Sequence, residues 1–137
     1  MRNRLAGWLG MMLAVSVFAA ACSTGPATGD VSGTVQVDGK TPAPGSSITF
    51  MPSDGKSPSA GSLIANGRYT TRVPVGTAKV EIRVPRVLAK SKAARQGPGA
   101  EGDVVEESLP AKYNDQTELR LDVKAGKNEK DWDLKSK

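Results

Sequence analysis

The chain has 137 residues, with 19 Lys and Arg against 14 Asp and Glu, and a formal net charge of +5 at pH 7. It holds one cysteine and no histidine, which excludes an intramolecular disulfide and every catalytic site built on a histidine base. The basic residues do not cluster with aromatic ones, so we do not expect a nucleic-acid-binding protein.

Residues 1–21 have the three parts of a secretory signal peptide. Arg2 and Arg4 precede an apolar run that is shorter than the roughly 20 residues typical of a membrane-spanning helix. The run ends in Ala19-Ala20-Ala21-Cys22, which resembles a bacterial lipobox, although that pattern usually has Leu at the position of Ala19. The resemblance implies a lipidated Cys22 as the first mature residue. Ordinary cleavage with release of the protein and an uncleaved anchor are the alternatives.

The residue after the cysteine bears on location. Ser23 stands where lipoproteins kept in the inner membrane tend to have Asp, so the resemblance implies a protein at the outer membrane or periplasmic face. Residues 23–30 are small, polar and rich in Gly and Pro, which predicts a flexible tether. Residues 22–30 thus comprise the cysteine, lipidated if the resemblance holds, and this tether. We expect one folded domain over residues 31–137.

Seven segments of that domain alternate apolar and polar residues, which predicts strands with one buried face. The segments are Val31–Val37, Ser47–Met51, Ser59–Ala65, Arg68–Val73, Thr77–Val84, Thr117–Val123 and Glu129–Leu134. Tight-turn residues separate them at Asp38-Gly39, Asp54-Gly55, Asn66-Gly67 and Lys124–Asn128. Alternation with frequent turns favours an all-β fold, a seven-stranded antiparallel β-sandwich.

The alternation also assigns side chains to the core. We expect Ile48 and Phe50 to point inward, as well as Gly61, Leu63 and Ala65 in the third segment. Tyr69 and Trp132 fall on inner faces, which favours core packing over a role as ligand-binding aromatics.

Residues 85–114 lack strand periodicity and are predicted to form an irregular insertion. Within it, Val87–Arg95 is rich in helix-forming residues, which predicts a short helix. Basic residues come first and acidic residues follow, so the halves attract each other weakly or the segment binds a partner. The candidate interaction loop comprises Arg86, Lys90, Lys92, Arg95, Glu106 and Glu107.

Several motifs together resemble the carboxypeptidase regulatory-like, or transthyretin-like, domain. They are Val31-Ser32-Gly33-Thr34-Val35, Ile48-Thr49-Phe50-Met51-Pro52, Asn66-Gly67-Arg68-Tyr69 and Val73-Pro74-Val75-Gly76. The later runs Pro110–Asp115 and Lys124–Asn128 are similar to small lipoproteins of planctomycete-type bacteria that carry this domain. The resemblance implies a sandwich of prealbumin-like (Ig-like) topology and a non-enzymatic role.

No residue pattern predicts catalysis, a cofactor or a metal. Transthyretin-like hydroxyisourate hydrolases need catalytic histidines and a Tyr-Arg-Gly-Ser type tail, and the chain has neither. Asp131 and Asp133 fall on the same face of the predicted last strand, and their carboxylate oxygens are suitable ligands for a hard cation such as Ca²⁺. We prefer the interpretation that they lie at a solvated sheet edge. We therefore expect a membrane-anchored structural or protein-interaction module of the cell envelope. The alternatives are a small-ligand or glycan-binding envelope protein and a cryptic hydrolase.

Overall fold

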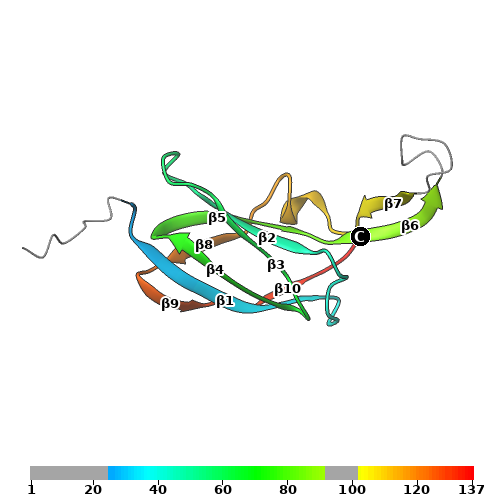
Figure 1. Cartoon of the computed structure of the whole chain (residues 1–137), viewed down its shortest axis with the longest axis horizontal. Coiled ribbons are helices and arrows are strands. Elements are labelled where there is room, and N and C mark those ends of the chain that lie inside the picture. The colour runs from blue at the N-terminus through cyan, green and yellow to red at the C-terminus, as the bar shows by residue number, and fades with distance from the viewer. Residues whose placement is uncertain (1–24, 92–101) are drawn as a thin grey trace, which may run out of the picture.

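The computed structural model describes residues 25–91 and 102–137, and this part of the chain is all-β (Figure 1). One four-stranded sheet contains β1 (Thr28–Val37), β4 (Arg68–Pro74), β9 (Gly126–Glu129) and β10 (Trp132–Leu134). The other has the order β3 (Ala60–Leu63), β2 (Ser47–Pro52), β5 (Gly76–Arg83) and β8 (Arg120–Val123). A two-stranded ribbon is formed by β6 (Pro85–Ser91) and β7 (Gly102–Glu107). A 3₁₀ turn spans Ala111–Tyr113.

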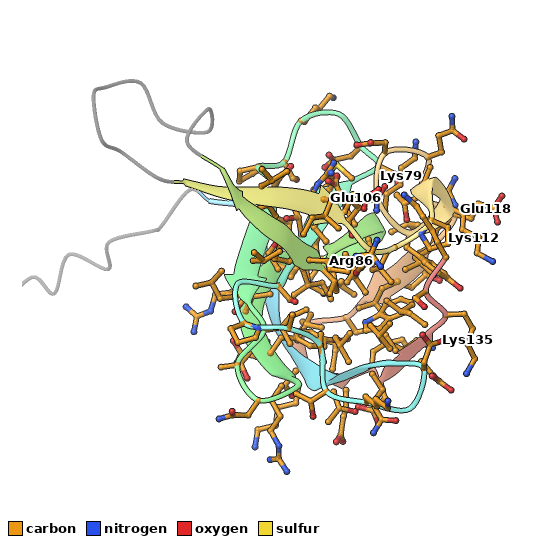
Figure 2. All side chains as sticks on the ribbon, turned by 90° about the vertical axis from the view of Figure 1, so that its right-hand side faces the viewer. Lys79, Arg86, Glu106, Lys112, Glu118 and Lys135 are labelled. Carbon is orange, nitrogen blue, oxygen red and sulfur yellow. The ribbon has the colours of Figure 1, made fainter. Side chains whose placement is uncertain are left out.

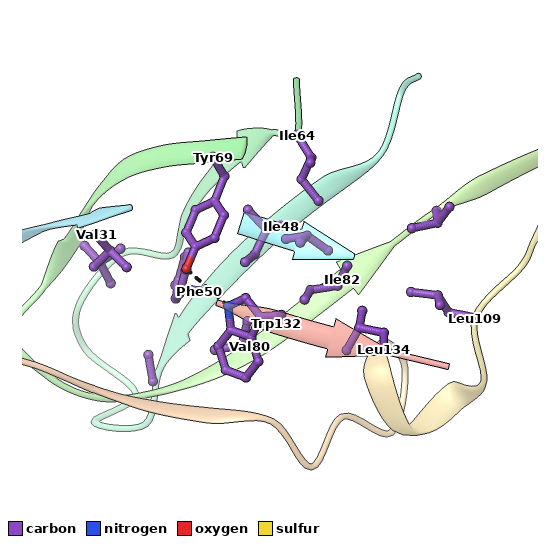
Figure 3. Packing of buried hydrophobic residues seen from close by; sticks show 14 of the residues in the cluster. Val31, Ile48, Phe50, Ile64, Tyr69, Val80, Ile82, Leu109, Trp132 and Leu134 are labelled. Carbon is purple, nitrogen blue, oxygen red and sulfur yellow. Dashed lines mark hydrogen bonds between the residues drawn. The ribbon is translucent and has the colours of Figure 1, made fainter. Parts of the chain in front are cut away.

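The core lies between the two four-stranded sheets (Figure 3). Val31, Ile48, Phe50, Val80 and Ile82 are fully buried, as their alternation with polar neighbours predicts. Tyr69 and Trp132 also lie in this core, so their predicted inward orientation is confirmed. The predicted all-β sandwich is thus the fold of the protein.

The predicted turns at Asp38-Gly39 and Asn66-Gly67 are confirmed as well. Asp38 and Asn66 adopt positive φ angles of 51° and 52°, and each is followed by a glycine with positive φ. Two central residues with positive φ make the type of hairpin turn that matches the twist of the flanking strands.

The last strands depart from the antiparallel pattern. β1 pairs antiparallel with β4, but β9 and β10 both run parallel to β1 along its other edge. Strands joined by a tight hairpin must be antiparallel, whereas a strand that arrives from the opposite sheet is free of that constraint. The chain makes such a crossing between β8 and β9, so that β9 already begins inside the turn predicted over Lys124–Asn128.

The third predicted segment has the wrong face assigned to the core. Leu63 is 70% exposed, whereas its neighbour Ile64 is only 5% exposed. Ala65 forms a bridge with Arg68 across the Asn66-Gly67 turn, and cross-strand partners share a face. Because Arg68 is exposed, Ala65 is exposed too and Ile64 turns inward. A shift of one residue therefore reverses the predicted faces.

Several predicted strand boundaries also differ. The segment predicted as Glu129–Leu134 forms a strand only over Trp132–Leu134, and Glu129 ends β9. β1 begins at Thr28, inside the stretch predicted to be a tether, because Thr28–Asp30 pair with the end of β4. The segment predicted as Thr117–Val123 forms a strand only over Arg120–Val123.

The predicted irregular structure of residues 85–114 is wrong for residues 85–91 and 102–107, which form β6 and β7. Val87–Ser91 belong to β6 rather than to a helix, and β6 pairs antiparallel with β7. A short helix gains little from propensity alone because nucleation is costly, and here Val87 pairs with Val105 across the ribbon instead. The rest of the predicted helix, with Lys92 and Arg95, lies outside the described residues.

Candidate functional site

The β6–β7 ribbon belongs to neither sheet of the sandwich and extends from one end of its longest axis (Figure 1). It exposes apolar side chains to solvent: Val87 is 57% exposed, Leu88 53%, Val104 38% and Val105 55%. A two-stranded ribbon by itself is only marginally stable in water. Exposed apolar residues on such an element are typical of a surface that binds another molecule.

The register of the ribbon places apolar residues on both of its faces. Arg86 pairs with Glu106 and Val87 pairs with Val105, so these consecutive pairs point to opposite faces. The register then shifts between Val87 and Ala89, and the next pair is Ala89 with Val104. The shift is a bulge that leaves Leu88 as the extra residue.

The root of the ribbon is held firmly against the sandwich. The backbone N–H and the hydroxyl of Ser108 both donate to the carbonyl of Val84, at 3.0 and 2.8 Å. The Glu107 Oε1 accepts hydrogen bonds from the backbone N–H groups of Val84 at 3.1 Å and Leu109 at 2.9 Å. Leu109 itself is fully buried. The apolar ribbon is therefore presented on a rigid base.

An open groove of about 470 Å³ lies beside this root. We call it the root groove, and it is lined by Ala43, Pro44, Val84, Pro85, Arg86, Val87 and Ser108. A second hollow of about 450 Å³ shares Pro44 with it and includes the exposed Leu63. The two hollows and the ribbon give this end of the sandwich an extended apolar surface.

Four of the six charged residues of the predicted interaction loop lie in the described part of the chain, whereas Lys92 and Arg95 lie outside it. Arg86 and Glu106 form an ion pair with 2.9 Å between Nη2 and Oε2, and both side chains lie on the ribbon (Figure 2). Glu107 turns to the root of the ribbon, and Lys90 pairs with Asp103 in the strand register. The exposed ion pair contributes less than about 1 kcal/mol, so apolar contacts dominate this surface.

Asp131, one of the two acidic residues of the C-terminal segment, is hydrogen-bonded within the fold. The Asp131 Oδ1 accepts hydrogen bonds from the Thr34 N–H at 2.7 Å and the Thr34 hydroxyl at 2.8 Å. These two bonds, the backbone one first, lower the pKa of Asp131. Within the described residues, no three metal-ligating side chains come together. The carboxylate of Asp131 instead ties the junction of β9 and β10 to β1.

Sequence reasoning missed Asn114, a buried polar residue that follows the 3₁₀ turn. It is 3% exposed, its Oδ1 accepts from the Asp115 N–H at 2.8 Å, and its Nδ2 has no hydrogen-bond partner within the described part of the chain. It lines an open polar hollow of about 340 Å³ together with Lys79, Glu81 and Asp115. No periodicity or motif in the sequence singles out this residue.

The predicted lipidation site, Cys22, and the predicted signal peptide lie outside the described residues. Within the described residues, no helix has the length and hydropathy needed to cross a bilayer. Comparison of the chain with protein-family models, curated proteins and solved structures gave no match.

Proposed function

We propose that the protein is an exported lipoprotein, anchored to the cell envelope through a lipid on Cys22. In this proposal the β-sandwich is a non-catalytic, carboxypeptidase regulatory-like module that binds another envelope protein. The proposed location is supported by the signal-peptide pattern of residues 1–21 and by the cysteine that follows it.

The exposed apolar ribbon is the observation that carries the binding role. Val87, Leu88 and Val105 are each more than half exposed, although fully burying a side chain of this kind contributes about 1.5–3 kcal/mol. Covering the ribbon and the root groove with a partner would recover that free energy. Rigid presentation by Val84 and Ser108 lowers the entropy cost of binding.

A protein partner fits this surface better than a glycan does. Sugar-binding sites commonly stack a sugar ring on an exposed aromatic side chain, but Tyr69 is 3% exposed and Trp132 is 7% exposed. The root groove offers Pro and Val side chains, which match apolar side chains of a protein segment.

The anchor is tested by Cys22→Ser. We expect the wild-type protein to fractionate with membranes and its intact mass to include the acyl chains. The Cys22→Ser protein should move to the soluble fraction or remain unprocessed. Unchanged fractionation and processing of the variant would refute the anchor.

The binding role is tested by placing a photo-cross-linking amino acid at Val87 in growing cells. We expect one discrete protein adduct, which Leu88→Asp should abolish without changing the amount of the protein. The control position is Thr70, which is exposed on β4 away from the ribbon. Adducts of equal yield at Val87 and Thr70 would contradict a specific surface.

A further inference from the structure

We propose that the end of the sandwich opposite the ribbon lies against the anionic headgroups of the membrane, so that the ribbon points away from the bilayer. This inference rests on the proposed lipid at Cys22 and adds an orientation to it. The membrane-facing surface, here called the exit face, comprises Ala27, Val75, Lys124, Ala125 and Lys127.

The chain leaves the sandwich at a fixed point. The N–H of Val75 donates to the carbonyl of Ala27 at 2.8 Å, and Thr28 pairs with Pro74 in the sheet. The peptide is therefore held at the β4–β5 turn from Ala27 onward. β1 begins at the opposite end of the longest axis from the ribbon (Figure 1).

The anchor is too short to let the domain move far from the bilayer. From Cys22 to Ala27 the chain can extend by at most about 3.6 Å per residue, or roughly 18 Å in total. By comparison, the 10 residues of β1 span about 33 Å at a strand rise of about 3.3 Å. A lipid on Cys22 thus keeps the exit face near the headgroups, while the ribbon can lie a domain length away.

The charges favour the exit face as the contact. Lys124 and Lys127 are exposed and form no ion pair within the described residues. Of the nearby carboxylates, Asp30 pairs with Arg72 at 3.2 Å. Asp122 accepts a hydrogen bond from the Thr77 hydroxyl at 2.6 Å but keeps its charge, so the two lysines still outnumber it. A lysine close to an anionic leaflet contributes about 1 kcal/mol of attraction.

Charge gives the ribbon no comparable attraction to the membrane. Residues 85–107 contain four basic and four acidic side chains, so this segment has no net charge. An anionic leaflet therefore attracts the exit face more than the ribbon. An apolar surface held away from the bilayer is free to meet a protein partner.

The orientation is tested with the lipidated protein in vesicles of phosphatidylethanolamine and phosphatidylglycerol. Ala125→Cys and Leu88→Cys each provide a single free thiol for a fluorophore, because acylation blocks Cys22. A quencher on the lipid headgroups should quench the Ala125→Cys label several-fold more than the Leu88→Cys label. Equal quenching, or stronger quenching at Leu88→Cys, would overturn the orientation.

Three further variants separate the effect of tether length from the effect of charge. Inserting about 20 Gly and Ser residues after Ser23 should reduce the difference between the two labels, because a flexible linker of this length releases the exit face. The double variant Lys124→Glu with Lys127→Glu should weaken quenching of the Ala125→Cys label. Lys112→Glu with Lys135→Glu makes the same charge change near the ribbon end and should leave it unchanged (Figure 2). If both double variants changed quenching of the Ala125→Cys label equally, Lys124 and Lys127 would not be the residues that attract the domain to the anionic headgroups.

The intact mass of each reconstituted protein separates this inference from the proposed anchor. A mass without acyl chains refutes the lipid on Cys22, and the orientation fails with it. A mass with acyl chains together with strong quenching at Leu88→Cys refutes the orientation alone.

Discussion

Trp132 and Tyr69 meet through a hydrogen bond of 3.2 Å from the indole Nε1 to the phenol oxygen (Figure 3). The Tyr69 hydroxyl in turn donates to the carbonyl of Lys130 at 2.6 Å. The two aromatic residues come from β10 and β4, the strands on either side of β1. This chain of bonds satisfies two polar groups inside the core and joins the C-terminal strand to the rest of its sheet.

Trp132→Ala should lower the free energy of unfolding by about 3–5 kcal/mol, because it leaves a large cavity and removes the hydrogen bond that the indole donates to Tyr69. Urea unfolding followed by far-UV circular dichroism measures this. Leu63→Ala is the matched control and should change stability by less than about 0.5 kcal/mol, since Leu63 is 70% exposed. A small loss for Trp132→Ala would place the indole on the surface.

Stability should fall at alkaline pH because of Tyr69. Burial raises the pKa of Tyr69 to about 12, so the folded protein keeps the phenol proton that an unfolded tyrosine loses near 10. The folded state then binds more protons than the unfolded one, and stability decreases as pH rises above 10. Tyr69→Phe should be less stable than wild type at pH 7, because it loses the bonds to Lys130 and Trp132.

The difference in free energy of unfolding between wild type and Tyr69→Phe should narrow as pH rises from 10 to 12, when measured by urea unfolding at each pH. This window follows from the ordinary pKa of 10 and the folded value of about 12. A gap that stays constant across this range would show that Tyr69 ionises normally in the folded protein.

Gly33→Ala should destabilise the sandwich by about 1–3 kcal/mol, a cost typical of overpacking. A Cβ at Gly33 would overlap the carbonyl of Lys130, where the chain passes from β9 to β10 beside β1. Gly25→Ala is the control, because, apart from its chain neighbours, no atom of residues 25–91 and 102–137 lies within 4 Å of a Cβ at Gly25. Thermal unfolding compares the two variants, and an unchanged melting temperature for Gly33→Ala would refute the close approach.

Acid should destabilise the protein through hydrogen-bonded carboxylates. The Ser57 hydroxyl, with the backbone N–H groups of Lys56 and Ser57, lowers the pKa of Asp54 from 3.8 to about 2. A lowered folded pKa gives stability that is present above 3.8 and is lost as pH falls toward 2. Ser136 lowers the pKa of Asp38 in the same direction, through its hydroxyl first.

Urea midpoints at pH 6 and pH 2.5 should therefore differ more for wild type than for Asp54→Asn. Asp133→Asn is the matched control, because Asp133 is exposed in β10 and its carboxylate accepts no hydrogen bond within the described residues. If Asp54→Asn and wild type lost the same stability in acid, the Asp54 turn would not contribute to the pH dependence.

The sequence by itself determined the features that depend on neighbouring residues. Alternation placed Ile48, Phe50, Val80 and Ile82 in the core, because successive side chains of a strand must point to opposite faces. Asn66-Gly67 specified a hairpin turn, because both positions adopt positive φ. The prediction of an all-β sandwich needed nothing further.

Only the tertiary structure decided which face of the third strand is buried, in which direction the last strands run, and which residues form the exposed apolar surface. Leu63 and Ile64 are adjacent and equally apolar, and the register across the turn chose Ile64 for the core. The charge pattern pointed to residues 85–114 as an interaction segment, but the apolar root groove joins Pro44 to Val87, which are far apart in the chain. Contacts between residues so far apart in the sequence depend on how the two sheets pack against each other. No local pattern of residues predicts that packing.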